Sequence, residues 1–165
     1  MNKPNYIVIH CSATREDKDF TEKQVNEAHV ARGFGKWGYH YYIRKDGRVV
    51  LMRAENEIGA HDNCMVPGEK ISYNRCSIGI CYEGGLDKNG KAKDTRTEAQ
   101  KVAMIALVQD ICKRYQILDV LGHRDTSPDR NENGIVEKCE WLKECPCFDV
   151  KSEFKSWLPT IIVKP

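Results

Sequence analysis

The sequence lacks the features that mark membrane-spanning, secreted, repeat and multidomain proteins. No apolar run approaches the roughly 18 residues of a membrane span, so we expect no membrane insertion. The first apolar run, Tyr6 to Ile9, is too short for the core of a secretory signal. This predicts a protein without a signal peptide that is cytoplasmic as synthesised. No internal repeat, linker or low-complexity tract divides the 165 residues, and this length predicts one domain over residues 1–165.

An excess of charge of one sign is also missing. The chain carries 26 Lys and Arg residues against 24 Asp and Glu residues, which leaves a net charge of +2, and it has no block of basic residues. Nucleic acid is therefore not an expected partner, whereas an anionic polymer is compatible as a substrate. With 41% hydrophobic and 30% charged residues, the composition is that of a folded globular protein rather than a disordered one.

Paired cysteine motifs are absent although the chain has eight cysteines. No two of them have the Cys-x-x-Cys spacing, which argues against a four-cysteine structural zinc site. Disulfide frameworks are typical of secreted chains. Without a signal peptide, we therefore expect mostly reduced thiols.

Hydrophobic periodicity and capping signals predict alternating strands and helices. Capping boxes at Thr21–Gln24 and Thr97–Gln100 predict the starts of two helices. The Asp46-Gly47 turn predicts a hairpin, and alternation within its first strand puts Tyr39 and Tyr41 on one face. Strands are expected at 6–10, 38–43, 49–52, 77–82 and 118–121, and a closing helix at 150–158. The prediction is an α/β fold with a central mixed β-sheet flanked by helices.

The stretch from Gly122 to Asp149 concentrates residues that can bind zinc. It contains His123 and Cys145, with Lys143 two residues before the cysteine. Zinc prefers nitrogen and sulfur ligands, and a catalytic zinc takes three protein ligands and keeps one position open. The best third candidate is His10, at the end of the first predicted strand. Taken singly, His10 would be read as a capping histidine and Lys143 as a solvated surface residue.

The loop 129–140 fits the twelve-residue pattern of a calcium site. Gly134 stands at position six, where the loop turns sharply. The expected ligands are the side chains of Asp129, Asn131, Asn133 and Glu140, and the carbonyl of Ile135. An exposed Asn-Gly turn in a polar loop would show the same residues, so both interpretations stay open.

Five separated segments, in order along nearly the whole chain, resemble type-2 N-acetylmuramoyl-L-alanine amidases and, more distantly, peptidoglycan recognition proteins. They are 7–14, 38–40, 73–74 with 77–81, 122–125 and 143–149. The loop between His123 and Lys143 departs from the phage members of the family because it is much longer here. Cys147 also departs, since a small residue is usual at its position, and the metal is therefore assigned to Cys145.

The resemblance implies an activity and a metal. It implies that His10, His123 and Cys145 hold one zinc ion and that the substrate is peptidoglycan or a muropeptide. The expected reaction is hydrolysis of the amide bond between the lactyl group of N-acetylmuramic acid and L-alanine. Zinc would polarise the carbonyl and acidify a water molecule.

The resemblance also implies roles for three further residues. Lys143 is expected to stabilise the developing oxyanion. Tyr39 is expected to orient the water or the carbonyl and to relay a proton, although a strand tyrosine is otherwise more often a core residue. His61 matches a histidine near the substrate groove, and a simple loop hydrogen bond is its alternative role.

The biological setting that follows is a phage or prophage endolysin, a monomer released to the wall by a separate lysis system. Three alternatives stay open: a non-catalytic peptidoglycan-binding module, a cytoplasmic amidase that recycles soluble muropeptides, and a structural zinc or calcium protein. Cys145 weighs against the first, because binding modules of this architecture lack the cysteine ligand. Tyr39 and Lys143 together weigh against the third.

Overall fold

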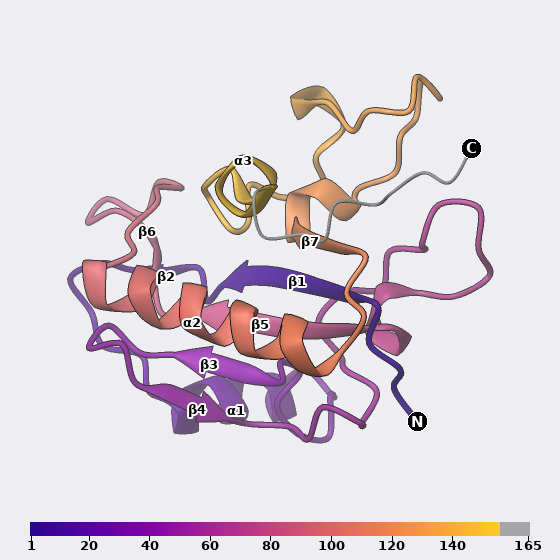
Figure 1. Ribbon diagram of the computed structural model, residues 1–165. Helices are drawn as coiled ribbons and strands as arrows, with labels where there is room; N and C mark the ends of the chain where they lie inside the picture. Colours follow the sequence, from indigo (N-terminus) through magenta and orange to yellow (C-terminus); the bar gives the residue numbers. More distant parts are fainter. Residues whose placement is uncertain (156–165) are drawn as a thin grey trace.

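A five-stranded mixed sheet forms the centre of the molecule. The computed structural model describes residues 1–155 (Figure 1). The strand order is β4 (Val49–Leu51), β3 (Tyr41–Ile43), β5 (Ser77–Tyr82), β1 (Tyr6–Cys11) and β7 (Asp119–Gly122). Neighbouring strands from β3 to β7 are parallel, and only β4 pairs antiparallel, through the hairpin with β3. The predicted α/β fold with a mixed sheet is therefore confirmed.

Helices cover both faces of this sheet. Helix α2 (Glu98–Arg114) lies along one face and α1 (Glu22–Ala31) lies on the other (Figure 1). Both predicted capping boxes are present, at the N-termini of these two helices. Because side chains alternate along a strand, β1 directs Ile7 and Ile9 into the cluster that α2 covers. Val8 and His10 are directed to the opposite side.

Short elements complete the fold. Strands β2 (Thr14–Arg15) and β6 (Gly85–Leu86) form a separate parallel pair. Helix α3 (Val150–Phe154) packs beside β7. The 3-10 turns are η1 (Tyr73–Arg75), η2 (His123–Thr126) and η3 (Lys138–Glu140). The closing helix begins at its predicted position, and residues 156–158 of that prediction lie outside the described part of the chain. No helix within residues 1–155 is long and apolar enough to cross a membrane.

The predicted faces of the strand at 38–43 are wrong. The strand begins only at Tyr41, after bends at Gly38 and His40, so regular alternation does not extend back to Tyr39. Tyr39 packs with Tyr42 on the α1 side, whereas Tyr41 packs against the α2 cluster. The bend brings Gly38 so close to the loop at Ala60 that a Cβ atom on Gly38 would lie 2.2 Å from the Ala60 carbonyl oxygen. Tyr39 is thereby placed on the side of the sheet that holds His10.

Candidate active site

Parallel pairing brings the first two predicted zinc ligands together. Strand β1 pairs with β7 in a register that sets Ile9 opposite Gly122, so the next residues, His10 and His123, follow side by side. Their Nδ1 atoms lie 3.1 Å apart. The carboxyl ends of parallel strands meet at one edge of a sheet, which is where ligands bind in open α/β sheets.

Cys145 reaches the same point from the long loop. Its carbonyl oxygen accepts the backbone N–H of Arg124 at 2.8 Å, and its Sγ accepts the backbone N–H of Cys11 at 3.3 Å. The Sγ lies 4.0 Å from Nδ1 of His10. Ligand atoms of His10, His123 and Cys145 all lie within 4.8 Å of one another.

The chemistry and spacing of these donors fit a zinc ion. Tetrahedral zinc with ordinary bond lengths sets nitrogen ligands about 3.3 Å apart, and nitrogen and sulfur about 3.6 Å apart. The observed separations of 3.1 Å and 4.0 Å differ from these values by a few tenths of an ångström. Burial, followed by the neighbouring His123, lowers the pKa of His10 well below its usual value. Burial also lowers the pKa of His123, although Asp62 opposes the shift. Both imidazoles are therefore neutral near pH 7, as metal ligation requires.

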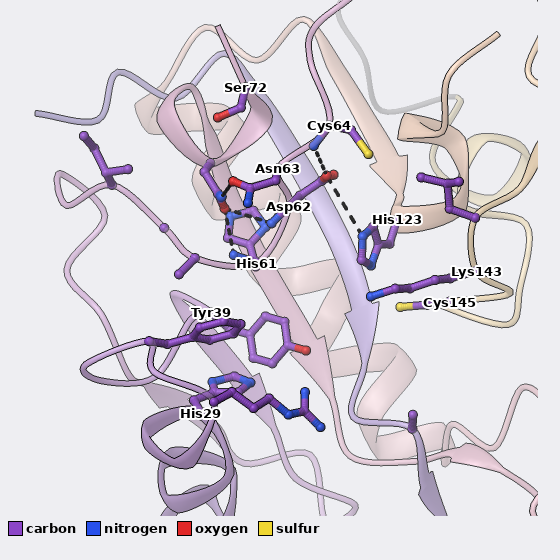
Figure 2. Close-up of a pocket in the computed structure, with 18 of the residues that line it drawn as sticks. His29, Tyr39, His61, Asp62, Asn63, Cys64, Ser72, His123, Lys143 and Cys145 are labelled. Carbon is purple, nitrogen blue, oxygen red and sulfur yellow. Dashed lines mark hydrogen bonds and ion pairs between the residues drawn. The ribbon is translucent and has the colours of Figure 1, made fainter. Parts of the chain in front are cut away.

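A pocket of about 920 Å³ opens above the three donors. Tyr39, His61, His123, Lys143 and Cys145 all line it. Figure 2 shows the Tyr39 hydroxyl directed into the pocket, toward the side from which Lys143 and Cys145 extend. Burial raises the pKa of Tyr39 well above its usual value, so its phenol is a hydrogen-bond donor at neutral pH. Below the pocket, His10 is only 1% exposed, and its ring centroid lies 5.1 Å from that of Tyr39.

The structure adds residues to which the sequence assigned no role. Asp62 Oδ1 lies 4.0 Å from Nε2 of His123. Asn74 binds the loop that carries Asp62, as described below. His29 is buried in helix α1 and also lines the pocket. Spacing along the chain gave no signal for Asp62 or Asn74, because their contacts depend on the path of the loop 59–74.

The cysteines outside the predicted metal site are free thiols. All eight lie within the described residues, and none is in a disulfide. The Sγ of Cys147 lies 3.9 Å from that of Cys11 and donates to the carbonyl oxygen of Gly85 at 3.3 Å. Cys147 therefore points toward strand β6, whereas Cys145 points toward the two histidines.

The side chains of the predicted calcium loop make hydrogen bonds within the loop. Asp129 Oδ2 accepts the backbone N–H of Gly134 at 2.7 Å. Asn131 and Asn133 each accept the backbone N–H two residues further on, at 3.0 and 2.8 Å. Both carboxylate oxygens of Glu140 accept backbone N–H groups of the loop. These contacts describe the polar turn of the alternative interpretation, and calcium binding stays a prediction.

Proteins similar to this chain include amidases and peptidoglycan recognition proteins. Residues 1–134 match the family described as N-acetylmuramoyl-L-alanine amidase. An endolysin of Klebsiella phage KP32 is 32% identical over 145 residues, which is 88% of this chain and 82% of the endolysin. Peptidoglycan-recognition protein SC2 of Drosophila melanogaster is 28% identical over 165 residues, which cover 94% of this chain and 75% of that protein.

A solved structure agrees with these matches in fold. The endolysin N-acetylmuramoyl-L-alanine amidase LysCS from Clostridium intestinale superimposes with a TM-score of 0.66 at 30% identity, over 93% of this chain and 85% of that one. The resemblance inferred from the five sequence segments is confirmed. The chain is an enzyme of the N-acetylmuramoyl-L-alanine amidase family.

Proposed function

We propose that this protein is a zinc-dependent amidase that hydrolyses the bond between N-acetylmuramic acid and L-alanine in peptidoglycan. The observation that carries the proposal is the convergence of His10, His123 and Cys145 at the base of one pocket. The family match ends at residue 134 and does not include Cys145. The position of the thiol beside the two histidines therefore supports the proposal independently of that match.

Zinc would be held by two neutral imidazole nitrogens and one thiolate. When bound there, it supplies a Lewis acid for the amide carbonyl and lowers the pKa of a water molecule. His123 and Cys145 line the pocket, so a metal held by the three residues would be accessible to substrate from it.

The remaining chemistry falls to two residues of the pocket. Lys143 extends its cationic Nζ into the pocket, where it can stabilise negative charge that develops on the carbonyl oxygen. Tyr39 holds its proton at Oη, because burial disfavours the phenolate. It can therefore donate a hydrogen bond to the carbonyl oxygen and take part in proton transfer toward the leaving amine.

The proposed setting is lysis of a bacterial wall by a phage or prophage enzyme. Two relatives described above carry the name endolysin, which supports an intact wall as the substrate. In this setting the protein reaches the wall after release by a separate lysis system. A cytoplasmic amidase that acts on soluble muropeptides is the competing assignment. Calcium in the loop 129–140 plays no part in this proposal.

Purified peptidoglycan tests the proposal directly. The wall is incubated with the enzyme, with the chelator-treated enzyme, and with the chelator-treated enzyme after zinc is restored. We expect new L-alanine amino termini in the first and third samples and almost none in the second. Release of reducing sugar ends without new amino termini would contradict the proposed bond. A parallel assay with soluble muropeptides separates the two substrates, because a strong preference for them would contradict the endolysin setting.

A further inference from the structure

Two consecutive residues contact the two proposed zinc histidines on the side away from the metal position. Nδ1 of His61 lies 3.0 Å from Nε2 of His10. Oδ1 of Asp62 lies 4.0 Å from Nε2 of His123, and Figure 2 shows Asp62 directed toward that ring. The Nδ1 atoms of His10 and His123 face each other at 3.1 Å. The dipeptide His61-Asp62 therefore lies next to Nε2 of both proposed ligands, the ring nitrogen on the side away from the metal position.

The His61 ring occupies space that two glycines leave free. A Cβ atom on Gly59 would lie 2.5 Å from Cδ2 of His61, and a Cβ atom on Gly79 of strand β5 would lie at the same distance. Real Cβ atoms do not approach this closely. Packing against the two glycine backbones thus fixes the edge of the ring that carries Nε2. The opposite edge, with Nδ1, is directed at His10.

One asparagine holds the backbone of this dipeptide. Oδ1 of Asn74 accepts the backbone N–H of His61 at 2.7 Å and that of Asp62 at 2.8 Å. Its Nδ2 donates to Oδ1 of Asn63 at 2.7 Å. Asn74 belongs to the turn η1, which leads directly into β5, and it is 8% exposed. The loop is therefore tied to the sheet that carries His10.

Asp62 has an acceptor atom to spare. It is only 2% exposed, and its Oδ1 accepts the backbone N–H of Cys64 at 2.9 Å. Oδ2 is buried and has no hydrogen-bond partner within residues 1–155. A buried acceptor without a partner is unfavourable, so native proteins rarely keep one without a reason. Nε2 of His123 lies 4.0 Å from Oδ1 of this carboxylate, so the charge of Asp62 is close to the imidazole N–H when its proton is on Nε2.

We propose that His61 and Asp62 are positioning residues that orient His10 and His123, and that Asn74 fixes the backbone of His61 and Asp62. An imidazole binds a metal through one nitrogen and carries its proton on the other, and the partner of that proton fixes the tautomer and the ring orientation. His61 accepts the Nε2–H of His10, and the Asp62 carboxylate stabilises the Nε2–H of His123. Both rings thereby present Nδ1. The inference rests on the proposed zinc site.

Zinc affinity is the measurement that tests this inference. It is determined for the purified protein by competition with a chromophoric chelator, and absorption of the cobalt-substituted protein reports the ligand geometry. The variants are His61→Leu, His61→Asn, Asp62→Asn and Asn74→Leu. Loss of such a partner typically weakens metal binding by about 10- to 100-fold, and we expect losses in this range for His61→Leu and Asn74→Leu. His61→Asn keeps an acceptor oxygen, so it should recover part of the affinity.

Ser72→Ala is the matched control, since Ser72 lines the same pocket and should leave zinc affinity unchanged. Thermal melting of the zinc-free proteins shows which variants fold. If the leucine variants do not fold, His61→Asn and Asp62→Asn still test the inference. Tight zinc binding by the parent and equal binding by all folded variants would overturn the inference and leave the proposed function intact. Absence of zinc binding by the parent would overturn the proposed function itself.

Discussion

The backbone N–H of Cys11 donates to Sγ of Cys145 at 3.3 Å and joins positions 134 residues apart in the chain. Because Cys11 follows His10 directly, this hydrogen bond sets the distance between the first proposed ligand and the thiol. The carbonyl oxygen of Cys145 accepts the N–H of Arg124, next to His123. Main-chain contacts therefore hold the three donors together.

Cys145→Ser should lose most of the bound zinc and all activity. A neutral hydroxyl replaces a thiolate in the variant, whereas the hydrogen bond from Arg124 to the carbonyl of residue 145 keeps the segment in place. Zinc content is measured by atomic emission, and folding by circular dichroism. Cys147→Ser is the matched control and should keep its zinc, because the Cys147 thiol points toward Gly85. Stoichiometric zinc in Cys145→Ser would rule out Cys145 as a ligand.

Tyr39→Phe and Lys143→Ala should keep zinc and fold but lose turnover. Removal of one well-placed donor to a developing oxyanion lowers kcat by on the order of a hundredfold or more. Release of L-alanine amino termini is the assay, with zinc content measured on the same samples. Tyr41→Phe is the control, because the Tyr41 hydroxyl donates to Glu55 at 2.6 Å, outside the pocket. Activity within a few-fold of the parent in both variants would remove the two residues from the mechanism.

The sequence was sufficient for the parts of this protein that local patterns determine. Two capping boxes marked both long helices, and apolar runs marked β1 and β5. His10 and His123 were named as candidates because each lies at the end of a predicted strand, and the parallel pairing of these strands in the structure brings them together. Cys145 could be preferred over Cys147 only from the resemblance to a known family.

The sequence was insufficient where the path of a loop decides which atoms meet. Nothing in the spacing of Asp62 and Asn74 indicates that one side chain faces His123 and the other binds the 61–62 backbone. The face of Tyr39 was also predicted wrongly, because the bend at Gly38 depends on close contact with Ala60. Long-range contacts of this kind have no local signature.

The zinc-free protein should lose stability as the pH falls below about 6.5. Burial, followed by Arg32 and Arg53, lowers the pKa of His29 to about 4. An unfolded histidine has a pKa of about 6.5. Between these values the residue binds more protons in the unfolded chain than in the folded one, so the His29 contribution to the free energy of unfolding falls with falling pH and levels off below about pH 4. Above about pH 6.5, this contribution is fully present and constant.

Urea unfolding of the zinc-free protein at several pH values between 7 and 4.5 measures this effect. His29→Gln supplies the comparison, because glutamine can still accept the Gly38 N–H, which donates to His29 Nδ1 at 2.8 Å, but does not titrate. The variant should show a smaller loss of stability over this range. The pKa values of the other four histidines, His10, His40, His61 and His123, are also lowered, so these residues contribute to the remaining dependence. An unchanged pH dependence in His29→Gln would show that His29 is not a source of the effect.

The loop 129–140 should depend on the Glu140 carboxylate even without calcium. One oxygen accepts the backbone N–H groups of Arg130 and Asn131, at 2.8 and 3.2 Å, and the other accepts that of Glu137 at 2.9 Å. These donors hold the pKa of Glu140 below its usual value. Glu140→Gln removes the charge and one acceptor, so it should speed proteolytic cleavage between residues 129 and 140. Cleavage at the parent rate would show that these contacts do not order the loop.

Calcium adds a second, separable effect at the same residue. If Asp129, Asn131, Asn133, Ile135 and Glu140 bind the ion as their spacing predicts, calcium stabilises the folded state by mass action and raises the melting temperature. We expect Glu140→Gln to abolish that rise and to leave zinc content intact. Glu140 already accepts three backbone N–H groups, so faster proteolysis of Glu140→Gln in calcium-free buffer does not by itself indicate an ion site. The decisive measurement is therefore calorimetric titration of the parent, where absence of both heat and a melting shift would identify the loop as a polar turn closed by its own hydrogen bonds.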